Sequence, residues 1–296
     1  MGDPANLAYI AGLALGILII LSVIAIFVRD RKVGAGGLGL GALGFALLAL
    51  PLLKEADFGG NKFQFQDSRH QTDLIKAANP PDQPKPNNNA NTTPSSAVRQ
   101  VAIINSSSTD DDQIKSFISA LQKQITDDVS PYWRVQANLS FYSSKDKIPA
   151  GTWSLNVLNT TDDVGMMGYH LFDATSNVPI AKIFAEDAKK YNTPLSFLAS
   201  HELINMLINP NLTRFIEDNN QHYAVEPASP CGSLQQSYVK NGVTLSDFVY
   251  PSWYKMNTDT HYDYAGKAIK PLTPCQGGYV LILDPTTNTW KTVTGN

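Results

Sequence analysis

The stretch SHELINMLINP, residues 200–210, decides how the fold is interpreted. His201 and Glu202 match the start of the metal-binding motif H-E-x-x-H, in which two histidines on one helix face bind zinc and the glutamate activates a zinc-bound water. Here the fourth residue after His201 is Asn205. The spacing therefore predicts a helix that places His201, Asn205 and Asn209 on one face, with Glu202 beside them. Amide side chains are poor zinc ligands, so the spacing suits a metal and the residue types do not.

Signals on both sides of this stretch predict where the helix begins and ends. Thr193 is the expected cap, Pro194 the expected first helical residue, and Asn209-Pro210 the expected end. Upstream, residues 98–105 read as a buried strand, and an acidic turn opens an amphipathic helix over 109–125. Further strands are predicted at 134–142, 152–159, 168–172, 180–186, 243–250 and 278–284. The expected class is α+β.

The N-terminal region predicts a membrane anchor. Residues 7–28 and 33–53 carry no charge, and each is long enough to cross a bilayer as a helix of about 20 residues. The basic cluster at residues 29–32 favours a cytoplasmic loop, which leaves both termini extracytoplasmic, in a periplasm or at a cell surface. A signal peptide is the alternative for the first stretch, but the apolar run is too long and no basic flank precedes it. Residues 54–97, rich in Pro and Asn towards their end, are expected to form a juxtamembrane segment and linker.

Charge and cysteine content narrow the functional classes. The net charge of −3 offers no basic surface for nucleic acid, so we expect no nucleic-acid partner. Cys231 and Cys275 both lie in the predicted exterior part, where a pair usually forms a disulfide. Two buried free thiols are the alternative. Metal binding by this pair is not expected, because neither has a second Cys or His at short spacing.

Three motifs carry a resemblance to a known group. ASHELINMLINP, YAVEPASPC and GVTLSDFVYPSWY are similar to segments of a little-characterised group of bacterial zincin-like proteins, whose helix reads H-E-x-x-E-M-L-x-D-P. The likeness covers roughly residues 98–256. By this resemblance Asn205 replaces a glutamate, Asn209 replaces an aspartate, and Glu226 stands where the group has aspartate. The resemblance implies a zincin-like domain over residues 98–296 with a degenerate metal motif.

Two interpretations of this site remain open. In the first, His201 and Glu202 form a hydrogen-bonded pair that ties the helix to the sheet, and no metal is present. In the second, His201, His222 and Glu226 rebuild a zinc site, with Glu202 as the general base. His170 lines the site or packs in the core.

The expected function is that of a non-catalytic, membrane-anchored accessory or scaffold subunit without a cofactor, bound to other proteins of a membrane complex. The alternatives are a zinc metallopeptidase with the rebuilt site and a peptide-binding module that uses the inherited cleft. The aromatic-rich segment 248–264 is either part of the core or a contact surface.

Overall fold

The computed structural model describes residues 98–144, 146–161, 166–256, 260–284, 286 and 289–295. All of them belong to one of the two units into which the chain divides, Phe63–Asn296. The predicted membrane spans 7–28 and 33–53 and the linker 54–97 lie outside the described residues. Within the described ranges, no helix combines the length and apolar character needed to cross a membrane.

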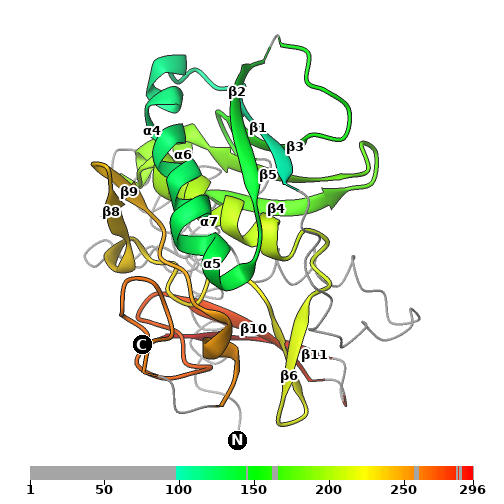
Figure 1. Cartoon of the computed structure of the whole chain (residues 1–296), viewed down its shortest axis with the longest axis vertical. Helices are drawn as coiled ribbons and strands as arrows, with labels where there is room; N and C mark the ends of the chain where they lie inside the picture. Colours follow the sequence, from blue (N-terminus) through cyan, green and yellow to red (C-terminus); the bar gives the residue numbers. More distant parts are fainter. Residues whose placement is uncertain are drawn as a thin grey trace, which may run out of the picture. The chain divides into compact units, whose positions relative to one another are not determined.

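The first layer is a five-stranded mixed sheet, which confirms the strands predicted before residue 187. Its strands are β1 (Arg99–Asn105), β2 (Ala137–Ser143), β3 (Trp153–Leu158), β4 (Gly168–Asp173) and β5 (Val178–Phe184). They lie in the order β2-β1-β3-β5-β4 (Figure 1). Neighbouring strands are parallel except β4, which runs antiparallel to β5 at one edge. Edge strand β4 is the strand that contributes to the site.

One face of this sheet is covered by helices. Helix α4 (Asp111–Lys123) begins after Asp110, whose side chain accepts a hydrogen bond from the Asp112 N–H, and it continues through a π-helical segment (Gln124–Val129) into α5 (Ser130–Trp133). The short α6 (Ala185–Lys190) leads to α7 (Leu195–Ile208). Alternate residues of β1, β3 and β5 form one apolar core with α4 and α7, so both helices pack on the same face.

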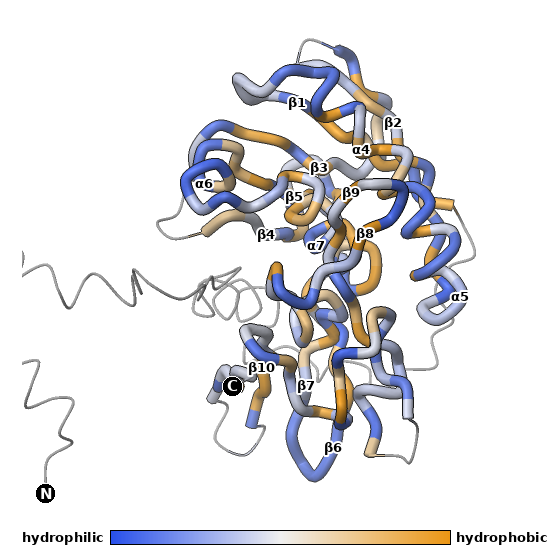
Figure 2. Tube along the Cα trace, turned by 90° about the vertical axis from the view of Figure 1, so that its left-hand side faces the viewer, coloured by the Kyte–Doolittle hydropathy of each residue, from blue (hydrophilic) through white to orange (hydrophobic). Residues whose placement is uncertain are grey.

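Helix α7 is buried on every side. All fourteen of its residues are buried, and Figure 2 shows it as a mainly hydrophobic segment between the strands. The predicted helix is confirmed, but the predicted cap is wrong. Pro194 occupies the cap position without a side-chain hydrogen bond, and the Thr193 hydroxyl instead donates to the Tyr191 carbonyl. Because no face of α7 meets water, its polar residues must find partners inside the protein.

The C-terminal part builds a second, antiparallel sheet. Strands β6 (Phe215–Asp218), β7 (Gln221–Ala224), β10 (Tyr279–Asp284) and β11 (Thr289–Thr294) lie in the order β11-β10-β7-β6. Strands β8 (Tyr238–Lys240) and β9 (Val243–Leu245) form a separate hairpin, and short 3-10 helices span Leu234–Gln236 and Pro251–Tyr254. Of these strands, only β9 and β10 were predicted from the sequence.

The aromatic-rich segment is mainly core. Phe248, Trp253 and Tyr254 are fully buried, and the Trp253 and Tyr254 rings pack edge to face. Tyr264 is the exception, with 38% of its surface exposed. The question that the sequence left open is therefore decided in favour of packing for most of the segment.

The predicted disulfide between Cys231 and Cys275 is confirmed. Their Cα atoms lie 4.8 Å apart, within the usual bridging range. The bond joins the turn after the Glu226-Pro227 step to the segment that enters β10. It therefore links the surroundings of α7 to the second sheet.

Replacing both cysteines should destabilise the domain strongly. Cys231→Ala/Cys275→Ala opens a loop of 44 residues, which raises the entropy of the unfolded chain and should lower the free energy of unfolding by about 4 kcal/mol. Chemical denaturation of the full-length chain, beside oxidised wild type, measures the change. A loss below about 1 kcal/mol would contradict the constraint assigned to this bond.

Candidate functional site

The candidate site lies where α7 faces strand β4. Glu202 on α7 is fully buried and rests against Gly168 of β4. A Cβ at Gly168 would lie 3.1 Å from both Cγ and Oε1 of Glu202. The absence of a side chain at Gly168 therefore leaves room for the glutamate beside the strand.

His170 of β4 stands between two glutamates. Its Nδ1 lies 3.5 Å from Oε2 of Glu202, and its Nε2 lies 3.7 Å from Oε2 of Glu226. The same Nε2–H donates to the Asn209 carbonyl at 3.3 Å. The two carboxyls thus contact opposite edges of one imidazole ring, which joins β4, α7 and the segment after β7.

Asn205 of α7 and Asn209, which directly follows the helix, hydrogen-bond to neighbouring segments. The Asn209 side-chain amide donates to Oε1 of Glu226 at 2.9 Å, and its Oδ1 accepts from the Arg214 N–H. Asn205 Oδ1 accepts from the Ala228 N–H at 2.9 Å, and its amide donates to the Ser229 hydroxyl. Both amides therefore serve as donor and acceptor, which a carboxylate at the same position could not do.

His201 has different neighbours from those of Glu202. Its Nδ1 lies 3.5 Å from the Ser246 hydroxyl, and a Cβ at Gly232 would come within 2.8 Å of its Cε1 atom. Burial, with a contribution from the neighbouring His170, lowers the pKa of His201 to about 3. The imidazole is therefore neutral at physiological pH. In place of the predicted pairing of His201 with Glu202, the glutamate contacts His170.

The His170 cluster binds protons more tightly than the same groups in water. Burial alone would lower the pKa of His170, but the carboxyls of Glu226 and Glu202 outweigh it and raise the pKa. Burial raises the pKa of Glu202, and burial raises the pKa of Glu226 to about 7. The neutral arrangement holds one imidazolium, one carboxylate and one protonated carboxyl, which avoids burying a net charge.

The residues of the predicted zinc set, His201, His222 and Glu226, come from three separate parts of the chain. His222 lies on β7, where its Nε2 is 3.9 Å from Oε2 of Glu217 on β6. In the described part of the chain, Cys231, Asp247 and Asp263 are the one group of three possible ligands whose atoms all lie within 4.8 Å of one another. His201, His222 and Glu226 do not form such a group.

The fold and this cluster define a mixed α/β domain in which a buried histidine of β4 lies between two buried glutamates, Glu202 of α7 and Glu226. Comparison of the chain with family models, with curated proteins and with solved structures gave no match in any of the three.

Three residues of the polar clusters, His170, Asp247 and Asp263, belong to no sequence motif that predicts their role. His170 was left between packing and site lining, although it is the centre of the network. Asp247 and Asp263 were not considered, and both are buried. Their positions near the predicted aromatic core were the available signal, because a carboxyl in such a segment needs a partner.

The cluster should make stability depend on pH. Because the folded pKa of Glu226 lies above that of the unfolded chain, the folded state binds more protons and the free energy of unfolding falls as pH rises through about 7. Glu226→Gln keeps the acceptor for Asn209 and removes the titrating group. It should remove about 1 kcal/mol of the fall between about pH 6.5 and 8, measured by chemical denaturation at each pH.

The pH range of about 6.5 to 8 avoids an opposite pH dependence that comes from His201. The lowered pKa of His201 makes stability decrease as pH falls below about 6.5, where the unfolded chain takes up a proton. Glu186→Gln, an exposed change in the first turn of α6, should leave the wild-type slope unchanged. An identical slope in Glu226→Gln and wild type would refute this role for Glu226.

A methyl group at Gly232 should disturb the site more than one at Gly168. At Gly232 the new Cβ would lie 2.6 Å from the Ala228 carbonyl oxygen, a backbone atom that cannot rotate away. We expect Gly232→Ala to lower the free energy of unfolding by about 1–3 kcal/mol. Gly168→Ala should cost less, because two of its three contacts are with the adaptable Glu202 side chain. Equal denaturation curves for Gly232→Ala and wild type would show that the helix face has more space than these distances indicate.

Proposed function

We propose that the chain is a non-catalytic, zincin-like accessory or scaffold subunit. Its N-terminal segments anchor it in a membrane, and its domain binds other proteins of a membrane complex on the extracytoplasmic side. The likeness of its motifs to a zincin-like group and the order of strand, helix, strands and buried helix support this assignment of the domain.

One observation carries the proposal: the groups that would perform catalysis are fully buried against other protein groups. A general base must reach a substrate or a bound water. Glu202 is instead fully buried between His170 and the Gly168 backbone. His201 is equally buried, and its neutral ring packs between Ser246 and Gly232. These contacts give each residue a structural role that requires no substrate.

The asparagines support the same conclusion. In the resembling group the helix carries carboxylates at these two positions, which suit a dication. Asn205 and Asn209 here make donor and acceptor bonds to neighbouring protein groups, and Asn209 directly binds Glu226. The substitutions therefore match a helix face stabilised by neutral hydrogen bonds.

A zinc metallopeptidase is the second candidate. The gathering of His170, Glu202 and Glu226 in one buried region favours it, because displaced pKa values are common at functional sites. A peptide-binding module is the third, and it is favoured by the position of β4 at the edge of its sheet, where an extended peptide could pair.

Activity and composition measurements separate these candidates. The full-length chain, extracted in detergent without chelator, should show no peptidase activity above that of Glu202→Gln and should co-purify with stoichiometric partner subunits. Elemental analysis should find the same zinc content in wild type and in His201→Ala. Peptidase activity lost in Glu202→Gln, together with zinc lost in His201→Ala, would overturn the proposal in favour of the enzyme. Saturable binding of unstructured peptides without partner subunits would favour the peptide-binding module.

Restoring a carboxylate on the helix tests the same proposal through stability. Asn205→Asp loses the donor to Ser229 and places a charge in a buried position, which should lower the free energy of unfolding by about 3 kcal/mol at neutral pH. Asn138→Asp, the same change at an exposed position of β2, should have little effect. Added zinc should not restore the stability of Asn205→Asp, since we propose that this face of α7 binds no metal ion. A rescue by zinc that requires His201 would contradict the proposal.

A further inference from the structure

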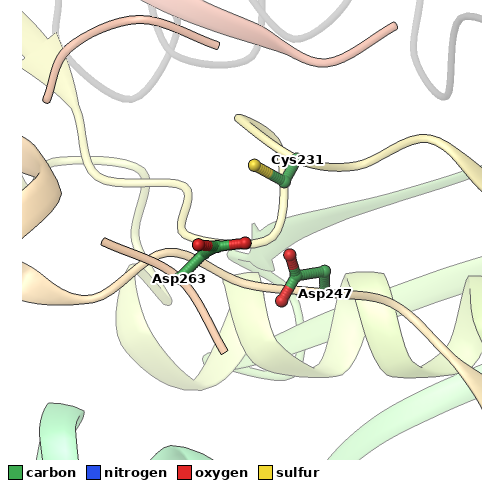
Figure 3. A group of neighbouring side chains, drawn as sticks. All are labelled: Cys231, Asp247 and Asp263. Atoms are coloured by element: carbon green, nitrogen blue, oxygen red, sulfur yellow. The ribbon is translucent and has the colours of Figure 1, made fainter. Parts of the chain in front are cut away.

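A second polar cluster lies in the aromatic-rich core. Cys231, Asp247 and Asp263 come from three separate segments, and one ligand atom of each lies within 4.8 Å of the other two (Figure 3). All three side chains are buried. Neither aspartate has a part in the proposed function, so the cluster requires its own explanation.

Backbone N–H groups hold both carboxyls in place. Oδ1 of Asp247 accepts two such hydrogen bonds, and the two oxygens of Asp263 accept one each. The donors are Phe248 and Ala265 for Asp247, and Lys267 and Ala268 for Asp263. Donors of this kind fix the orientation of a carboxylate, as outer contacts do around metal ligands.

The remaining oxygen of Asp247 points at the other carboxyl. Its Oδ2 accepts no hydrogen bond from any residue in the described ranges. Burial, together with the neighbouring Asp263, raises the pKa of Asp247 well above its ordinary value. Two buried carboxyls that face each other need a proton or a cation between them.

The two cysteines would stay close together without the disulfide. The Cys275 N–H donates to the Pro230 carbonyl at 2.8 Å, and the Tyr279 N–H donates to the Ser229 carbonyl at 3.0 Å. These backbone bonds hold the segment around Cys275 against the turn that carries Cys231. Reduction therefore leaves the thiol of Cys231 near the two carboxyls and the thiol of Cys275 beside that of Cys231.

We propose that reduction of the Cys231–Cys275 disulfide creates a zinc site formed by the thiolates of Cys231 and Cys275 and the carboxylates of Asp247 and Asp263. A dithiol reductant supplies two electrons and two protons, breaks the S–S bond and becomes a disulfide itself. Zinc then displaces the protons of its ligands, including the two thiol protons, which are released to solvent.

The geometry and the charge suit this ion. Tetrahedral zinc has Zn–S distances of about 2.3 Å and Zn–O distances of about 2.0–2.2 Å, so neighbouring ligand atoms lie about 3.3–3.8 Å apart. The ligand atoms of Cys231, Asp247 and Asp263 lie within 4.8 Å of one another, so only small side-chain movements would bring them to these separations. Two thiolates and two carboxylates around Zn²⁺ also carry the same net charge as the four-thiolate sites common in structural zinc proteins.

The test compares zinc uptake by the oxidised and reduced full-length chain. Both forms are equilibrated with zinc chloride, the reduced one in the presence of a phosphine, and are then freed of excess metal and analysed for zinc. We expect the reduced chain to retain one more zinc ion per chain than the oxidised chain. An equal zinc content in the oxidised and reduced chain would overturn the proposal.

Variants identify the ligands. Asp247→Asn keeps an oxygen that can accept the two backbone hydrogen bonds and places an N–H donor near the carboxyl of Asp263, so the oxidised variant should fold normally by circular dichroism. After reduction its zinc affinity should be at least about tenfold weaker, because even the loss of an outer contact costs about 10–100-fold. Asp112→Asn, the same change at an exposed position of α4, should bind zinc as wild type does. Wild-type affinity in Asp247→Asn would exclude the carboxylate.

The absorption of bound cobalt reports whether thiolates are ligands, and variants then distinguish this site from one that contains His201 of α7. The reduced chain with Co²⁺ should show sulfur-to-cobalt charge-transfer absorption, which Cys231→Ser should weaken and His222→Ala on β7 should leave unchanged. Absorption that is lost in His222→Ala would place the metal on the set of His201, His222 and Glu226 and refute this site. The proposed function does not depend on the result, since its own zinc test depends on His201.

Discussion

The domain depends on the requirement that a helix buried on every side must pair its polar groups internally. Helix α7 carries His201, Glu202, Asn205 and Asn209 into a region without water. An unpaired carboxylate there would cost several kcal/mol. His170 meets this requirement for Glu202, because its ring reaches both that carboxyl and Glu226.

This arrangement connects parts of the chain that are distant in sequence. His170 lies on the edge strand of the first sheet, Glu202 on the helix, and Glu226 just after a strand of the second sheet. Nearby, the disulfide joins the turn at Cys231 to the entry of β10. The polar network and the covalent bond thus add to the apolar core that α7 shares with residues of both sheets.

The two buried groups of acids differ in what separates their negative charges. In the α7 cluster an imidazole lies between the carboxyls, so the protein itself supplies the cation. In the Asp247–Asp263 pair no basic side chain intervenes among the described residues, and the backbone donors leave one oxygen unused. Oxygens of Glu202, Glu226 and Asp247 all accept no hydrogen bond in the described ranges. Only the Asp247–Asp263 pair has no basic group between its carboxyls, which is why we propose a metal ion there.

The sequence by itself determined the local elements and the chemistry available to them. The alternating apolar runs predicted β1 to β5, and the punctuation by Pro194 and Asn209 predicted the extent of α7, because these signals act over a few residues. The tertiary structure alone decided the partners of the polar groups. It brought His170 to Glu202 and Asp247 to Asp263, and it left His222 on another strand pair. Such contacts follow from the packing of distant segments, which local spacing does not encode.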